Sequence, residues 1–217
     1  MKTWWMACVA LCGALALPIA AQDEKKQPSE PVEAAAKEPY KIGSTVDENL
    51  VWRDIDGKPY KVKDLRGKVV MIHFWSIVCP WEKQAEPKFK AFQERYKDKD
   101  VVMLAIASNQ NELGTEPPPE RDPAQPTYEK IRKRLKDWKI TYPIILDHGN
   151  QISDLFQGKT TPHCFVIDPK GVIVYAGALD DDPKAEKGDQ AKAYVRDAID
   201  AALEEKTVEV KETKPYG

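Results

Sequence analysis

The segment Lys68–Trp75 (KVVMIHFW) constrains the fold of this 217-residue chain more than any other feature. It has the length of a strand and is almost continuously apolar, without the alternation that marks a half-exposed strand. A strand of this kind is covered on both faces, as in a parallel or mixed sheet flanked by helices. The sequence therefore predicts an α/β domain with this segment as its central strand.

The remaining segments follow the order expected of such a sheet. Short strands over 50–52 and 60–62 flank Asp56-Gly57, which is typical of a tight turn and predicts an N-terminal β-hairpin. After the central strand, the predicted elements are a helix over 80–96, a strand over 101–107, a helix over 127–138, a strand over 143–146, a helix over 151–156, strands over 164–167 and 172–175, and a helix over 185–203. This order fits one mixed sheet with helices on both faces.

The first 21 residues are typical of an export signal. Lys2 supplies the positive start, Trp4–Leu17 the apolar run and Pro18–Ala21 a small-residue exit, which predicts cleavage after Ala21. The apolar run is shorter than the roughly 20 residues that a membrane-spanning helix needs. Two alternatives stay open, an uncleaved segment that tethers the chain to a membrane and a lipid anchor on Cys12.

Three further segments divide the rest of the chain. Residues 22–40 are rich in Lys, Glu, Pro and Ala, which indicates a disordered linker. A single folded domain is predicted over 41–205, with a proline-rich surface insertion at 109–126. Residues 206–217 are charged and are predicted to form a frayed tail.

Charge and cysteine content narrow the function. The net charge of −2 gives no broad basic surface, so nucleic acid is not an expected partner. Removal of the export signal takes Cys8 and Cys12 with it and leaves Cys79 and Cys164. Two cysteines do not make a disulfide framework, even in the oxidising compartment that export implies. They favour thiol chemistry, or one reactive thiol and one buried thiol.

Cys79 stands where the central strand has ended and the next helix begins. The thiolate is the reactive form of cysteine, and the N–H groups and dipole of a helix N-terminus stabilise a thiolate. Pro80 suits the first helical position because the N–H that it lacks would be unpaired there. Cys79 is therefore the predicted nucleophile. Three residues on, where a dithiol motif has its second cysteine, the chain has Glu82.

Four features of the chain resemble one family. They are Phe74-Trp75 before the cysteine, Cys79-Pro80, Pro87 within the following helix, and Thr161-Pro162 before a strand. Over residues 42–203 the chain resembles the thioredoxin-like superfamily, in particular the exported redoxin branch near the alkyl hydroperoxide reductase/thiol-specific antioxidant proteins and the cytochrome-maturation thioredoxins. The resemblance implies a thioredoxin-like fold, protein or small-molecule disulfides and thiols as partners, and no cofactor.

The resemblance also implies a substrate groove. Thr161-Pro162 matches a pair whose proline peptide is cis and lies against the active-site cysteine. The backbone of Thr161 would then pair with an extended substrate chain, in the manner of strand addition. Pro80 borders the same groove, and the rings of Trp75 and Trp81 are predicted to form its apolar rim.

Glu82 is the departure from the dithiol pattern. It cannot resolve a mixed disulfide, and a carboxylate one turn from Cys79 should oppose thiolate formation. The sequence therefore predicts a monothiol oxidoreductase, in which a partner thiol releases the mixed disulfide. Two alternatives stay open, a one-cysteine peroxidase that consumes peroxides and a non-catalytic binding module that keeps the peptide groove.

The peroxidase alternative has support and objections in the sequence. The segment Val78–Glu82 resembles the peroxiredoxin active-site loop, and Ser76 occupies its hydroxyl position. However, Ile72 stands where peroxiredoxins carry a proline, and Pro162 stands where their catalytic arginine is expected. Without that cation, peroxide activation lacks a main electrostatic contribution. The monothiol prediction is therefore preferred.

The remaining chemistry-bearing residues lie near the predicted groove or in the core. His163 follows Pro162 and is predicted to tune the Cys79 thiolate. Cys164 is a candidate resolving thiol, with a buried packing cysteine as the favoured alternative. His73 is predicted to be a core residue with its ring nitrogens satisfied. No metal site is predicted.

Overall fold

The computed structural model describes residues 38–118 and 127–217. The predicted export signal, with Cys8 and Cys12, lies outside the described residues. So do most of the predicted linker and residues 119–126 of the predicted insertion. Within the described parts of the chain, no helix is both long enough and apolar enough to span a membrane.

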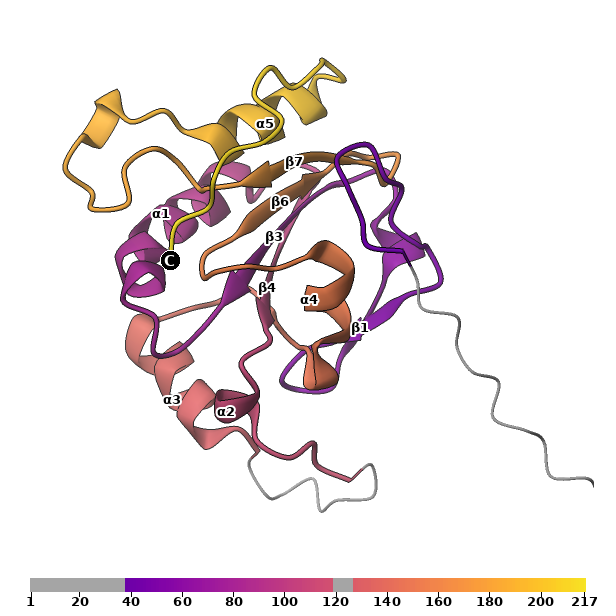
Figure 1. Cartoon of the computed structure of the whole chain (residues 1–217), viewed down its shortest axis with the longest axis vertical. Coiled ribbons are helices and arrows are strands. Elements are labelled where there is room, and N and C mark those ends of the chain that lie inside the picture. The colour runs from indigo at the N-terminus through magenta and orange to yellow at the C-terminus, as the bar shows by residue number, and fades with distance from the viewer. Residues whose placement is uncertain (1–37, 119–126) are drawn as a thin grey trace, which may run out of the picture. The chain divides into compact units, whose positions relative to one another are not determined.

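A mixed sheet of five strands lies at the centre of the described chain, in the order β5-β4-β3-β6-β7 (Figure 1). The strands are β3 (Val69–Trp75), β4 (Val101–Ala107), β5 (Ile144–Leu146), β6 (Cys164–Ile167) and β7 (Ile173–Gly177). β3 is parallel to β4 and antiparallel to β6. All seven residues of β3 are buried, which confirms the prediction of a central strand covered on both faces.

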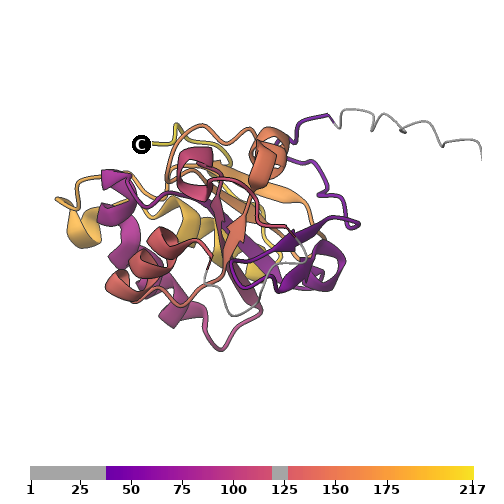
Figure 2. The same ribbon diagram turned by 90° about the horizontal axis from the view of Figure 1, so that it is seen from below.

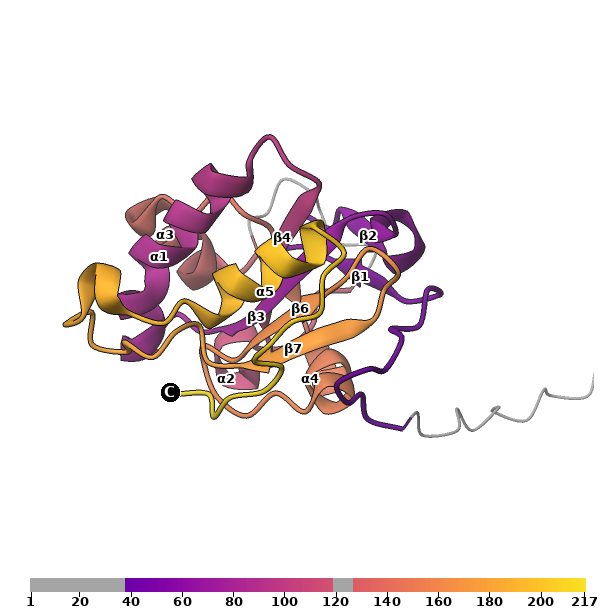
Figure 3. The same ribbon diagram turned by 90° about the horizontal axis from the view of Figure 1, so that it is seen from above.

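Helices cover both faces of this sheet (Figure 3). They are α1 (Pro80–Tyr96), α2 (Gln110–Leu113), α3 (Glu129–Trp138), α4 (Gln151–Phe156) and α5 (Tyr194–Leu203). Alternate residues of β3 pack into two separate hydrophobic cores, one on each face of the sheet, because successive side chains of a strand point to opposite faces. Met71 and Trp75 pack on the side of α1, α3 and α5, whereas Ile72 and Phe74 pack on the side of α4.

The predicted N-terminal hairpin is confirmed. It consists of β1 (Val51–Arg53) and β2 (Pro59–Lys61), which pair antiparallel. Gly57 adopts a φ of +80°, a conformation that glycine takes at little cost in such a turn. The chain before the hairpin passes alongside α4, where the Tyr40 N–H donates to the Leu155 carbonyl at 2.7 Å (Figure 2).

The last helix is shorter than predicted, because α5 begins at Tyr194 rather than at 185. The side chain of Asp182 accepts hydrogen bonds from the backbone N–H groups of Glu186 and Lys187. That of Asp181 accepts one from the N–H of Lys192. These carboxylates stabilise a loop by binding N–H groups before the helix, which is how short acidic side chains compete with helical structure.

The prediction of a frayed tail over 206–217 is wrong. Residues 211–213 run parallel to the end of β7: Ala176 N–H donates to the Lys211 carbonyl at 3.0 Å, and Thr213 N–H donates to the Ala176 carbonyl at 3.1 Å. Gly177 permits this approach, because a Cβ there would lie 2.2 Å from the Thr213 hydroxyl oxygen. Residues 211–213 of the tail are therefore held against the edge of the sheet by a parallel bridge.

We expect Ile72→Ala to lower the free energy of unfolding by about 2–5 kcal/mol, because Ile72 is fully buried between the sheet and α4. Urea unfolding would measure the change. Val51→Ala is the matched control, since Val51 is 47% exposed, and it should cost less than about 0.5 kcal/mol. Equal losses in the two variants would contradict the two-core description.

Candidate functional site

Cys79 occupies the N-cap position of α1, where its side chain makes no capping hydrogen bond. It has extended backbone angles, and Pro80 follows at the first helical position. The side chain is partly exposed and its thiol is free. The Cys79 Sγ donates a hydrogen bond to the carbonyl oxygen of Thr161 at 2.8 Å, although the two residues are 82 positions apart. The structure thus brings together the two residues that the resemblance assigned to one groove.

The Thr161-Pro162 peptide is cis, as the resemblance implies. Pro162 is buried and Thr161 is partly exposed. The N–H of Phe74 donates to the carbonyl of His163 at 3.0 Å, which extends the β3–β6 ladder as far as the residue after the proline. Sheet pairing therefore positions the Thr161 carbonyl beside the sulfur.

The apolar surface around Cys79 differs from the predicted one. Trp75 is only 1% exposed and packs in the core on the α1 side, so its ring lies below the surface and cannot form the rim. Trp81 and Pro80 are both accessible. Val78 is 69% exposed and is the apolar side chain that the sequence analysis did not assign to this surface. Its position directly before Cys79 was the one feature of the sequence that could have indicated this role.

Glu82 points into the protein. Its carboxyl is fully buried, and Oε1 lies 3.2 Å from Nδ1 of His73, which is also fully buried. Burial raises the pKa of Glu82 well above its ordinary value, and burial lowers the pKa of His73 to about 3. The pair is best described as a protonated carboxyl beside a neutral imidazole. The negative charge that was expected to oppose the Cys79 thiolate is therefore disfavoured by burial.

Glu82 and His73 belong to a buried polar cluster. The atoms in it that make no hydrogen bond within the described chain are both ring nitrogens of His73, both carboxyl oxygens of Glu82, Oε1 of Glu86 and Nε1 of Trp75. The 3.2 Å approach of His73 to Glu82 is thus close contact without hydrogen-bond geometry. His73 is a core residue, as predicted, but the prediction that its nitrogens are satisfied is wrong.

His163 lies on the other side of the sheet. Its ring packs 4.4 Å from that of Phe165 and 6.4 Å from that of Phe74, which both belong to the core on the α4 side. Its Nδ1 accepts the N–H of Lys159 at 3.3 Å. Burial lowers the pKa of His163 to about 4, so the imidazole is neutral at neutral pH. This placement gives the ring no role in tuning Cys79.

Cys164 faces the α1 side and is fully buried. It pairs with His73 across β3 and β6, and its thiol is free. Burial raises the pKa of Cys164 well above its ordinary value. A neutral thiol inside the core favours the packing role over the resolving role.

Glu112 holds the loop that precedes Cys79, and the sequence analysis missed it. One carboxylate oxygen accepts the Ser76 hydroxyl at 2.5 Å, and the other accepts the Ile77 N–H at 2.8 Å. Glu112 lies in α2, which Asn109 caps through the N–H of Asn111. The start of the predicted surface insertion is therefore part of the site. The Asn-x-x-Glu spacing, typical of a helix start, was the one signal for it.

We expect Glu112→Ala to lower the free energy of unfolding by about 1–3 kcal/mol, because the Ser76 hydroxyl and the Ile77 N–H would lose their acceptor. Urea unfolding would measure this loss. Glu116→Ala is the matched control, since Glu116 is exposed in the same segment, and should cost less than about 0.5 kcal/mol. An unchanged free energy of unfolding in Glu112→Ala would contradict the conclusion that Glu112 holds the loop before Cys79.

The raised pKa of Glu82 predicts how stability depends on pH. The folded state keeps the proton that the unfolded state loses at the ordinary pKa of 4.5, so this stabilisation is complete below that value and is lost as pH rises through the folded pKa. Glu82→Gln removes the ionisation. Relative to wild type, its free energy of unfolding should therefore increase as the pH rises from the ordinary pKa of 4.5 through the raised pKa of the folded state.

The control for this experiment is Ala91→Gln, because Ala91 is an exposed position of α1 and neither side chain ionises. Its difference from wild type should stay constant over the same pH range. Parallel stability profiles for Glu82→Gln and wild type would mean that Glu82 ionises in the folded protein as it does in the unfolded chain.

Comparison with known proteins identifies both sequence relatives and solved structures of similar fold. The thiol-disulfide oxidoreductase ResA of Bacillus cereus (strain ZK / E33L) is 28% identical over 141 residues, which are 64% of this chain and 71% of ResA. ResA of Bacillus subtilis (strain 168) is 25% identical over 140 residues, which are 64% and 69% of the two chains. The structure of a hypothetical protein from Sinorhizobium meliloti 1021 superposes with a TM-score of 0.65 at 22% identity, covering 82% of this chain and 94% of the other.

These comparisons agree with the geometry of the fold. The described chain has the mixed sheet, the flanking helices and the N-terminal hairpin of a thioredoxin-like protein. The family model for AhpC/TSA matches residues 44–176, which include β3, α1 and the Thr161-Pro162 peptide. This match covers more than half of the sequence, and the chain belongs to the AhpC/TSA family.

Proposed function

We propose that this protein is an exported thiol–disulfide oxidoreductase in which Cys79 is the single nucleophile. The observation that carries the proposal is the position of a partly exposed thiol at the N-terminus of α1, 2.8 Å from the Thr161 carbonyl. The relatives named thiol-disulfide oxidoreductase ResA support this class of reaction.

The proposed reaction begins when the Cys79 thiolate attacks one sulfur of a substrate disulfide. A bond forms between the two sulfurs, the original disulfide bond breaks, and the other substrate sulfur leaves as a thiolate that takes up a proton. An external thiol then attacks the substrate-derived sulfur of the mixed disulfide. This second exchange restores Cys79 and leaves the substrate sulfur joined to the external thiol.

An external thiol is needed because no second accessible thiol lies near Cys79 in the described parts of the chain. The residue one turn along α1 is Glu82, whose carboxyl is buried beside His73. Cys164 is free but fully buried. Both observations favour the monothiol mechanism over an internal dithiol cycle.

The surface around the sulfur suits a polypeptide or small-molecule disulfide. Val78 and Trp81 offer apolar contacts on one side of Cys79, and the Thr161 main chain lies on the other. The engaged hydroxyl of Ser76, which donates to Glu112, gives no support to peroxide as the preferred substrate.

Export belongs to the same proposal. It is supported by the sequence pattern of residues 1–21, and an uncleaved segment would tether the domain over 41–205 to a membrane. The charged linker over 22–40 would then set the distance between anchor and domain. Sequencing the N-terminus of the secreted protein would identify the cleavage site.

The test uses oxidised glutathione followed by mass spectrometry of the intact protein. Wild type and Cys164→Ser should each gain one glutathione that dithiothreitol removes, whereas Cys79→Ser should gain none, because Cys164 is buried. A parallel sample receives hydrogen peroxide and a trap for sulfenic acid. No glutathione adduct in folded wild type would refute the proposal, and rapid peroxide consumption with trapping at Cys79 would favour the peroxidase instead.

A further inference from the structure

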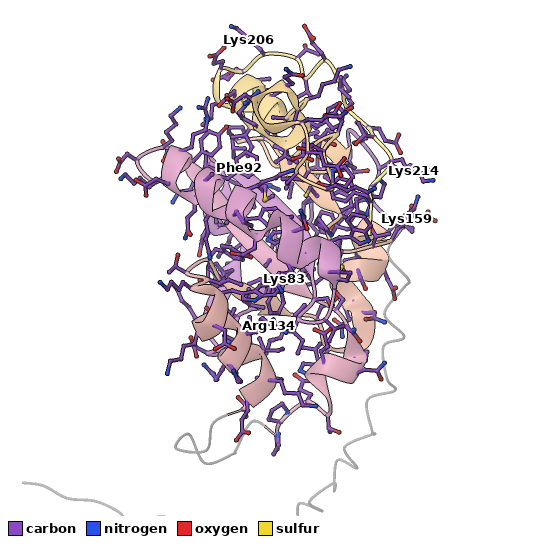
Figure 4. All side chains as sticks on the ribbon, turned by 90° about the vertical axis from the view of Figure 1, so that its left-hand side faces the viewer. Lys83, Phe92, Arg134, Lys159, Lys206 and Lys214 are labelled. Atoms are coloured by element: carbon purple, nitrogen blue, oxygen red, sulfur yellow. The ribbon has the colours of Figure 1, made fainter. Side chains whose placement is uncertain are left out.

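The end of the described chain lies in the groove beside Cys79. After residues 211–213 pair with the end of β7, the chain continues to a point between the N-terminus of α1 and the loop before β6 (Figure 1). Lys214 and Lys159 line the same hollow and lie at the same edge of the molecule (Figure 4). Residues 211–217 therefore connect the sheet edge to the candidate site.

The main chain of this segment lies against Thr161. A Cβ placed on Gly217 would be 2.7 Å from the Thr161 carbonyl oxygen and 2.9 Å from the Thr161 nitrogen. That carbonyl oxygen is the same atom that accepts the Cys79 thiol. Residue 217 thus occupies the main-chain edge at which an extended substrate would pair.

Tyr216 anchors the segment in three ways. Its hydroxyl donates to the buried carboxylate of Asp180 at 3.0 Å. Its ring lies 6.3 Å from that of Trp81 in an edge-on arrangement, and its carbonyl accepts the Thr160 hydroxyl at 3.3 Å. Asp180 is itself fixed by Lys88 of α1, whose Nζ lies 2.6 Å away. These contacts form a receptor for an aromatic side chain with a hydroxyl group.

We propose that the groove recognises an extended polypeptide with an aromatic side chain placed between Trp81 and Asp180, and that residues 213–217 occupy it as a built-in competitor. The inference rests on the proposed function for the identity of the groove. A segment joined to the same chain acts at an effective concentration of about millimolar, so a polypeptide substrate must displace it. A small disulfide needs less of the groove and is less affected.

The test is the binding of a synthetic heptapeptide with the sequence of residues 211–217, KETKPYG, to full-length protein carrying Cys79→Ser. Binding is followed through the indole N–H signals of the tryptophans in NMR spectra, with Trp81 assigned by Trp81→Phe. Tyr216→Ala frees the groove and should bind the peptide at least about tenfold more tightly than the parent. Glu209→Ala, which alters an exposed side chain before residues 211–217, should behave as the parent.

Tyr216→Phe is the second variant, because it keeps the ring against Trp81 and removes only the hydrogen bond to Asp180. It should bind the peptide with intermediate affinity and unfold at the parent's urea midpoint. The inference is overturned if Tyr216→Ala and the parent bind the peptide equally, or if neither binds at millimolar concentration.

The binding assay involves no thiol chemistry, so its outcome is separate from that of the glutathione experiment. If the protein forms no mixed disulfide but Tyr216→Ala binds the peptide more tightly than the parent, the proposed oxidoreductase function is refuted and the built-in competitor is supported. If the mixed disulfide forms at Cys79 but Tyr216→Ala binds the peptide no more tightly than the parent, the oxidoreductase function is supported and the built-in competitor is refuted.

Discussion

The antiparallel pairing of β3 with β6 is the constraint on which the site depends. It places Cys164 opposite His73 and ends where the Phe74 N–H meets the His163 carbonyl. The chain beyond that point turns at the cis peptide, so the Thr161 carbonyl lies over the start of α1. A shift of the register by one residue would exchange the two faces of β6 and separate the carbonyl from the sulfur.

Burial changes the chemistry of the residue that replaces a second cysteine. From the sequence alone, Glu82 is expected to be a carboxylate, one turn from Cys79, that opposes formation of the Cys79 thiolate. In the fold, the same position on α1 faces β3, and the carboxyl lies in contact with His73. A glutamate at this position supplies no second thiol and adds no nearby charge, and its burial makes the folded state less stable at higher pH.

The sequence allowed prediction of features that depend on local pattern. The central strand, the hairpin and the start of α1 at Pro80 follow from hydrophobic runs and turn residues. Side-chain direction was harder, because Trp75 and His163 each point to a face that only the pairing decides. The roles of Glu112 and Tyr216 could not be predicted from the sequence, because both depend on contacts between segments far apart in the chain.

Asp180 contacts two segments that lie far apart in the sequence, α1 and the last residues of the chain. Its carboxylate accepts from Lys88 in α1 and from Tyr216 in the last segment, so a change at one partner alters the charge balance felt by the other. Loss of the lysine would leave a nearly buried carboxylate with two neutral donors, the Tyr216 hydroxyl and the Asp182 N–H. These three positions should therefore vary as a unit among homologues, and their substitutions should combine non-additively.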